Sequence, residues 1–122
     1  MIYSYYKDKE QMPKHMEDVL QRYFPENTWG ASVLMCNGVV DVVTIYRVKI
    51  TGKTKYGGTE MEWTHYANIQ YLGRDWEINE QFMGEKEDEM WVYGTYKSFG
   101  GAVRGLATKG NSEKNRKPIL KF

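Results

Sequence analysis

The stretch that decides the fold runs from Val40 to Leu72, VDVVTIYRVKITGKTKYGGTEMEWTHYANIQYL. Both halves are rich in β-branched and aromatic residues that recur at every second position, which is the spacing of side chains along one face of a β-strand. The glycine-rich segment GKTKYGG between the halves is typical of a turn. The stretch therefore predicts two antiparallel strands, Val40–Ile50 and Glu60–Leu72, with Trp63 and Ile69 buried.

Strict alternation also predicts one continuous face for each of these strands. In the first strand that face consists of Val40, Val42, Thr44, Tyr46, Val48 and Ile50. In the second strand it consists of Met61, Trp63, His65, Ala67, Ile69 and Tyr71. Two strands of this length should form the centre of a twisted sheet.

The residues on either side of this stretch predict the remaining elements. Residues 12–24 place apolar side chains at helical spacing, and Pro25 ends that helix. Asn37-Gly38 lies between two β-rich runs and predicts a tight hairpin turn. Two further strands are expected in WEINEQF (76–82) and MWVYGTYK (90–97).

This order of elements predicts an α+β domain. We expect an N-terminal amphipathic helix packed on a five-stranded antiparallel meander, followed by a weak Gly-rich helix. Residues 1–110 are expected to form this single domain. Residues 111–122 read as a basic, polar C-terminal tail, whose last four residues, ILKF, have the alternative of docking back onto the domain.

Composition limits the function classes. Aromatic residues make up 15% of the 122 residues, and Tyr and Trp suit binding surfaces as well as cores. Cys36 is the single cysteine, which excludes an intrachain disulfide and a thiolate metal cluster. The first residues lack a signal-peptide pattern, and no apolar run is long enough for a membrane span. We therefore expect a cytoplasmic protein without membrane contact.

Charge is unevenly distributed along the chain. Acidic residues dominate residues 74–90, and basic residues dominate residues 97–122. Two such blocks neutralise each other, or they present two faces to different partners.

The stretch YKSFGGAVRGLATKG (96–110) is the main candidate ligand site. A strand followed by Ser and Gly and then by the start of a helix directs backbone N–H groups at an anion, and nearby bases add charge-assisted bonds to phosphate. The alternative is a plain glycine-rich bend, because neither the phosphate-loop pattern nor G-x-G-x-x-G occurs. The candidate ligand-binding residues are Lys97, Ser98, Gly100, Gly101, Arg104 and Lys109, with the aromatic residues Tyr93, Tyr96 and Phe99.

His65 is a weak candidate for a catalytic residue. It is the one histidine in a predicted strand, and Asp41 and Glu62 lie on strands that are expected to pair nearby. No serine or cysteine stands in a recognised nucleophile motif, so a half-buried, hydrogen-bonded histidine is the alternative. The histidine and cysteine spacing supplies no metal set, and no cofactor is expected.

Aromatic residues alternate with bases in IYRVKITGKTKYGG and VYGTYKSFGGAVRG, a combination that suits single-stranded nucleic acid. The sequence therefore predicts a small non-enzymatic binding protein whose partner is nucleic acid, a phosphate-bearing ligand or a charged protein. Chains of this composition are typical of phage and mobile-element inhibitors of host machinery. The alternatives are a small enzyme that uses His65 and a structural subunit that forms homo-oligomers through an exposed strand edge.

Overall fold

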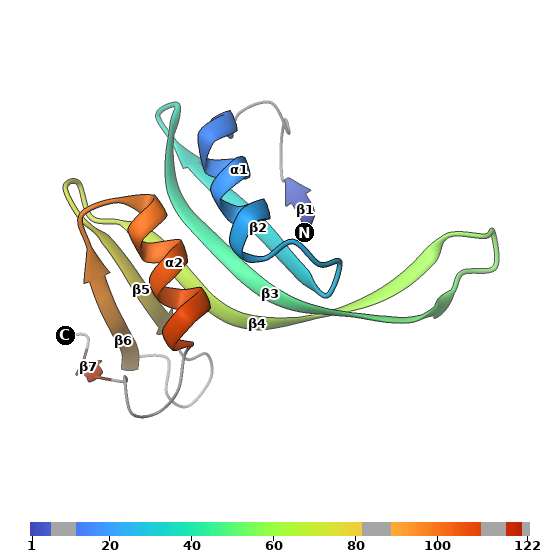
Figure 1. The fold of residues 1–122 in the computed structure, drawn as a ribbon. Coiled ribbons are helices and arrows are strands. Elements are labelled where there is room, and N and C mark those ends of the chain that lie inside the picture. Colours follow the sequence, from blue (N-terminus) through green and yellow to red (C-terminus); the bar gives the residue numbers. More distant parts are fainter. Residues whose placement is uncertain (6–11, 82–88, 111–116, 121–122) are drawn as a thin grey trace.

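The computed structural model describes residues 1–5, 12–81, 89–110 and 117–120. In chain order the elements are β1 (Ile2–Tyr5), α1 (Lys14–Tyr23), β2 (Trp29–Cys36), β3 (Val39–Lys53), β4 (Thr59–Tyr71), β5 (Trp76–Gln81), β6 (Glu89–Tyr96), α2 (Phe99–Lys109) and β7 (Lys117–Leu120). The seven strands form one sheet whose spatial order follows the chain from β1 to β7 (Figure 1). β1 pairs parallel with β2, and all later neighbours pair antiparallel.

This antiparallel-rich sheet with helices fits the α+β class, but the predicted arrangement is wrong. A strand precedes the first helix, and the described residues form a mixed sheet of seven strands, so the chain is not an N-terminal helix on a five-stranded antiparallel meander. α1 forms the crossover that a parallel β1–β2 pair requires. The two unpredicted strands, β1 and β7, have four residues each, too few to show a period.

Part of the predicted C-terminal tail belongs to the sheet. Residues 117–120, at its end, pair antiparallel with β6 as strand β7. The rest of the tail, at 111–116 and 121–122, lies outside the described residues, as do most of the acidic segment at 82–88 and the predicted end of β5 at residue 82.

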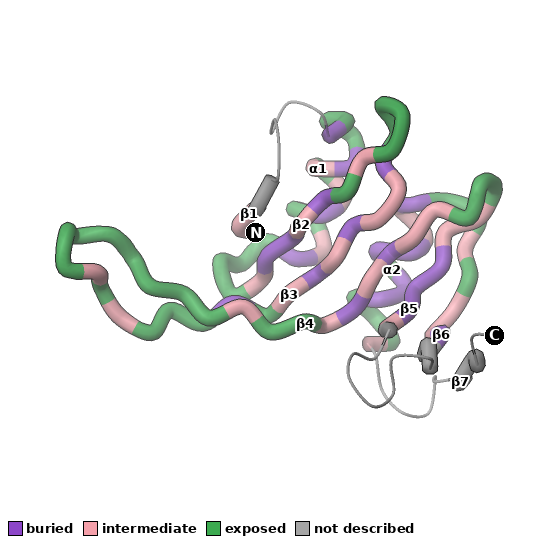
Figure 2. Tube along the Cα trace, turned by 180° about the vertical axis from the view of Figure 1, so that it is seen from behind, coloured by how far each residue is buried: buried purple, intermediate pink, exposed green. Residues whose placement is uncertain are grey.

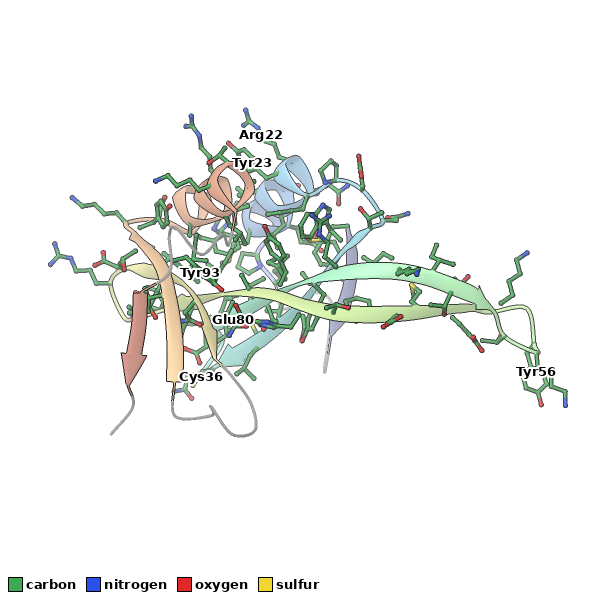
Figure 3. The ribbon with its side chains drawn as sticks, turned by 90° about the horizontal axis from the view of Figure 1, so that it is seen from below. Arg22, Tyr23, Cys36, Tyr56, Glu80 and Tyr93 are labelled. Carbon is green, nitrogen blue, oxygen red and sulfur yellow. The ribbon has the colours of Figure 1, made fainter. Side chains whose placement is uncertain are left out.

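Both helices cover the same face of the sheet (Figure 3). Leu20 of α1 and Leu106 of α2 are at most 1% exposed, and they meet an apolar row from the central strands. That row contains Val43, Ile45, Ile69 and Ile78. Each such side chain contributes ~1.5–3 kcal/mol when it is fully buried, so this layer is the main source of stability.

A β-bulge in β4 divides the predicted face of this strand in two. Ile45 pairs with Ala67, whereas Tyr46 pairs with His65, so Tyr66 is an extra residue. Because side chains alternate with a period of two, one extra residue moves all later side chains to the other face. The helices therefore face Ala67, Ile69 and Tyr71, whereas Met61, Trp63 and His65 point away from them. Ile69 is buried as predicted, but Trp63 is only half-buried.

A second bulge has the same effect in β3. Leu34 pairs with Val42 and Met35 pairs with Val40, so Asp41 is the extra residue. The core is supplied by Val43 and Ile45, and the predicted face of β3 beyond the bulge, residues 42–50, lies on the side of the sheet without helices.

The glycine-rich stretch is a helix, so the alternative of a plain bend is wrong. Residues Phe99–Lys109 form α2, whose N-cap is Ser98. The Gly101 N–H donates to Ser98 Oγ at 3.0 Å, which satisfies one backbone donor of the first turn. A Cβ on Gly105 would lie 2.2 Å from the hydroxyl oxygen of Tyr96, so this glycine lets the helix approach the sheet closely.

β3 and β4 extend beyond the body as a two-stranded arm, residues 49–62 (Figure 1). Every residue of the arm is exposed or half-buried, and Figure 2 shows this exposure along its length. The turn at Asn37-Gly38, with φ of 52° and 77°, is the tight hairpin that the sequence predicts at the other end of β3.

Candidate interaction surface

The face of the sheet opposite the helices, which we call the helix-free face, carries most of the exposed apolar side chains. Six large hydrophobic residues are exposed in the described part of the chain, and pairing and alternation place four of them on this face. These four are Leu34 at 59%, Val39 at 55%, Ile50 at 61% and Met61 at 40% exposed. The face is therefore an apolar surface of the kind that marks interaction sites.

These side chains form a stripe along β3 that continues onto the arm. On the helix-free face β3 presents Val39, Val42, Thr44, Tyr46, Val48 and Ile50, beside Leu34 of β2 and Met61 and Trp63 of β4. We call these residues the apolar stripe. Figure 3 shows Cys36 on this side of the sheet, whereas Arg22 and Tyr23 lie on the side of the helices. Cys36 is exposed.

At the base of the arm, the ring of Trp63 packs against Gly30 of β2. A Cβ on Gly30 would lie 2.3 Å from the Trp63 ring, so the ring occupies the space that any other residue at position 30 would fill. Tyr46 contacts Trp63 edge-to-face, with 5.4 Å between the ring centroids. Together these contacts give the stripe a fixed aromatic centre.

Beside the stripe, β4 and β5 present a network of uncharged amides around one carboxylate. The Asn68 Nδ2 donates to Asn79 Oδ1 at 3.3 Å, and Asn79 Nδ2 donates to Gln70 Oε1 at 3.1 Å and to Glu77 Oε1 at 2.9 Å. Asn79 is 1% exposed and Glu77 is 9% exposed. Because buried polar groups are costly without partners, these bonds fix the amide orientations and the register of β4 against β5.

His65 lies at the edge of this network rather than beside a carboxylate. Its Nε2 is 3.0 Å from Asn68 Oδ1, and its ring contacts Tyr46. The two acids that the sequence suggested as partners are elsewhere: Asp41 is in the β2–β3 bulge, and Glu62 pairs with Lys49 on the opposite face. Among the described residues, no carboxylate orients His65 as a general base would require.

Lysine and arginine side chains are absent from the helix-free face of the described strands β2 to β5, between Gly30 and Asn79, below the tip of the arm. The bases of β3 lie elsewhere. Arg47 and Lys49 alternate onto the other face, and Lys53 and Lys55 lie at the tip of the arm. A phosphate backbone placed on the apolar stripe would therefore meet no cation from these strands.

Arg47 stabilises the base of the arm on the side of the helices. Its guanidinium carbon lies 3.7 Å from the centroid of the Trp29 ring and 5.6 Å from that of Tyr66. The Trp29 ring in turn contacts the ring of Phe24, the C-cap residue of α1, with 4.7 Å between the ring centroids. Cation–π contacts of this kind contribute ~0.5–2 kcal/mol, so Arg47 joins the arm to the helical layer.

The polar residues of the predicted ligand site lie at and along α2. Lys97, Arg104 and Lys109 are exposed, and Ser98 caps the helix through its own hydroxyl. A Cβ on Gly100 would meet nothing within 4 Å, and a Cβ on Gly101 would lie 3.1 Å from Ser98 Oγ. Lys97 precedes the helix, Arg104 lies in its middle and Lys109 at its end, and the capping hydroxyl of Ser98 accepts one of the N–H groups of the first turn, that of Gly101.

The aromatic residues of that predicted site are parts of the fold. Phe99 is 6% exposed, and its ring contacts that of Trp76 with 5.1 Å between the ring centroids. Tyr96 packs against Gly105 of α2, and the half-buried Tyr93 donates its hydroxyl proton to Glu80 (Figure 3). None of the three rings is fully exposed for stacking on a base.

Sequence reasoning missed the apolar stripe and the arm, although one signal was present. Each of the two central runs is longer than the five to six residues that a typical strand needs to cross a small domain. In the structure β3 has 15 residues and β4 has 13, and the surplus forms the arm.

The described residues contain no group of three or more His, Cys, Asp or Glu side chains placed to hold a metal ion. None of the helices in that part of the chain is long and apolar enough to cross a membrane. Comparison of the chain with protein-family models, with curated proteins and with solved structures found no match.

Proposed function

We propose that this protein is a non-enzymatic binding protein that holds a partner protein against its helix-free face and its arm. The observation that carries the proposal is the position of Leu34, Val39, Ile50 and Met61, all exposed and all on one face. A surface of this kind stays in water only at a cost in free energy. Covering it with a complementary apolar surface is favourable by roughly 25 cal/mol per Å².

The surroundings of the stripe support a protein partner. Protein interfaces combine an apolar core that is poor in charge, aromatic anchors and a polar rim. Here Tyr46 and Trp63 supply the anchors, and the amides Asn68 and Gln70 lie on the rim. A chain of this kind acts by covering a surface of its partner, as the proposed role of a phage or mobile-element inhibitor requires.

The exposed Cys36 provides a direct test, because it is the single cysteine and lies on the proposed face. Benzophenone maleimide attached to Cys36 should cross-link one partner in an extract of cells that make the protein. The control is the variant Cys36→Ser/Arg104→Cys, which carries the same reagent on the exposed side of α2. Equal or stronger cross-linking from position 104 would contradict the proposal.

The purified partner then allows a quantitative test. Ile50→Ser/Met61→Ser should weaken binding by about 100-fold or more in calorimetry, because central apolar anchors each contribute on the order of 1–2 kcal/mol. The double variant Arg22→Ala/Arg104→Ala, on the helical layer, should change affinity less than about threefold. The opposite ranking would place the interface on the helices.

Nucleic acid is a second candidate partner, and the bases of β3 favour it. Arg47, Lys49 and Lys53 lie on β3, and Lys55 follows in the turn beside the exposed Tyr56. If they contact phosphates, binding to single-stranded DNA or RNA should weaken steeply with salt, and Lys97→Ala/Arg104→Ala should have little effect. No binding at 50 mM salt would eliminate this candidate.

A further inference from the structure

The tip of the arm is an ordered turn that presents one aromatic side chain. The Thr54 N–H donates to the Gly58 carbonyl at 2.7 Å, and the Gly57 N–H donates to the Thr54 carbonyl at 3.1 Å. The Gly58 N–H also donates to Thr54 Oγ1 at 2.8 Å. Tyr56 stands outside this closed turn and is 92% exposed (Figure 3).

The tip is also positively charged. Between Thr51 and Thr59 the chain contains Lys53 and Lys55 and no acidic residue. Both lysines are exposed, and no salt bridge involves either of them within the described residues. Lower on the arm, Lys49 pairs in register with Glu62, and Glu60 pairs with Gly52, so the arm as a whole carries three lysines and two glutamates. The arm carries the tip away from the body (Figure 1), so the carboxylate nearest to the two tip lysines in the sheet register is that of Glu60 on the arm itself, and the tip keeps a net positive charge.

We infer that the tip, residues Lys53, Lys55 and Tyr56, docks on an acidic surface of the partner protein and that Tyr56 enters a pocket between its carboxylates. This inference rests on the proposed function, since the tip and the apolar stripe would contact the same partner. Two exposed lysines favour a negative partner surface, and an exposed tyrosine on a hydrogen-bonded turn loses little backbone conformational entropy on binding.

A protein fits these features better than nucleic acid does. A polyanion would use cations along its whole contact, but the stripe that leads to the tip has none below Lys53. The partner must therefore offer an apolar region for Ile50 and Met61 next to acidic residues for the tip. Acidic proteins combine both kinds of surface.

The test uses a displayed library of random 16-residue peptides, selected on the full chain. Selected peptides should be rich in Asp and Glu beside an apolar or aromatic segment. Synthetic copies should bind Lys53→Glu/Lys55→Glu and Tyr56→Ala about tenfold or more weakly than the unchanged chain in fluorescence polarisation. The matched control Lys97→Glu/Arg104→Glu makes the same change in net charge on the helical side and should bind as the unchanged chain does.

The outcomes separate the inference from the proposed function. Peptides that lose affinity with Ile50→Ser/Met61→Ser but not with the tip variants would overturn the inference and leave the proposed function standing. Both the inference and the proposed function would be contradicted if peptide affinity changed neither with Ile50→Ser/Met61→Ser nor with the tip variants. A selection that yields no binding peptide would contradict both as well. Tighter binding of a 20-nucleotide DNA than of any peptide, or tip-dependent self-association in sedimentation, would also overturn the inference. Lys53→Gln/Lys55→Gln repeats the test if the charge-reversed chain loses its circular dichroism spectrum.

Discussion

At the scale of single residues, the glycines of α2 have different physical roles. A Cβ at Gly105 would lie 2.2 Å from the Tyr96 hydroxyl, so the helix reaches the sheet only because this position has no side chain. At Gly100 a Cβ would meet nothing within 4 Å. One glycine is thus required by packing, whereas the other only weakens the helix.

We therefore predict opposite effects for the same substitution. Gly100→Ala should stabilise the protein by ~0.5–1 kcal/mol, because alanine loses less conformational entropy in a helix. Gly105→Ala should destabilise it by ~1–3 kcal/mol, because the new methyl group displaces Tyr96. Urea unfolding followed by circular dichroism measures both changes. Equal shifts of the two midpoints in the same direction would show that α2 is not packed on Tyr96.

Tyr3 gives a second prediction at this scale. Its burial, followed by the charges of Glu17 and Asp18, raises the pKa of the Tyr3 hydroxyl to about 12 from 10.0. The folded state therefore holds this proton more tightly than the unfolded state. The resulting stability is present below pH 10 and is lost as the pH rises from 10 to 12.

The comparison is with Tyr3→Phe, which lacks the titrating group. Between pH 10 and 12 the urea midpoint of the unchanged chain should fall more steeply than that of the variant. Parallel curves would show that the hydroxyl titrates equally in both states. The hydroxyl also donates to the Glu17 carbonyl at 3.4 Å, so the variant should be slightly less stable below pH 10 as well.

At the scale of elements, the arm is the feature that the proposed function requires and that stability does not. All of residues 49–62 are exposed or half-buried, and the buried Val48 marks where the body begins. Because little apolar area is removed from water along the arm, its contribution to the free energy of unfolding is small.

Excision of the arm tests this separation. Lys49 and Glu62 are directly paired, so an Asn-Gly turn in place of residues 50–61 closes the hairpin in register. The free energy of unfolding of the shortened chain should lie within ~1 kcal/mol of that of the full chain. The shortened chain should nevertheless lose binding to the partner. A chain that fails to fold would show that the arm supports the body, whereas full binding would exclude the arm from the interface.

At the scale of the whole molecule, the two faces of the sheet are unequal. One face is covered by α1 and α2, and the other carries the apolar stripe and the amide network. The centre of β3 and β4 lies beneath the helices, and their far ends form the arm. The free energy of local opening should therefore decrease along β3 and β4 from the part beneath the helices to the arm.

Amide hydrogen exchange should show this gradient. We expect residues 43–45 and 67–69 to exchange only through global unfolding, because their side chains include fully buried core residues. Residues 49–62 should exchange through local opening, roughly a hundredfold faster or more. Uniform protection along both strands would mean that the arm is packed against something in solution, such as a second copy of the chain.

Local sequence patterns were sufficient to predict the elements that depend on residues close to one another in the chain. The Asn37-Gly38 turn, the helix before Pro25 and the two central strands follow from backbone preferences and periodicity within a few residues. The two edge strands were not predictable in this way, since each has four residues and forms only by pairing with a neighbour. The packing of Phe99 in the core and of Tyr96 against Gly105 was likewise not predictable, because these contacts join residues that local patterns do not relate.

What the sequence determined by itself is where the two helices and the five longer strands occur. Which face of each strand meets the helices was decided only in the tertiary structure. Extra residues at Asp41 and Tyr66 reverse the alternation within β3 and β4, and a bulge forms only when a strand is paired with its neighbour. The predicted single face of β3 was thereby divided, with Val40 in the core and its residues from 42 to 50 in the apolar stripe on the helix-free face. Long-range packing, rather than local preference, created the candidate interaction surface.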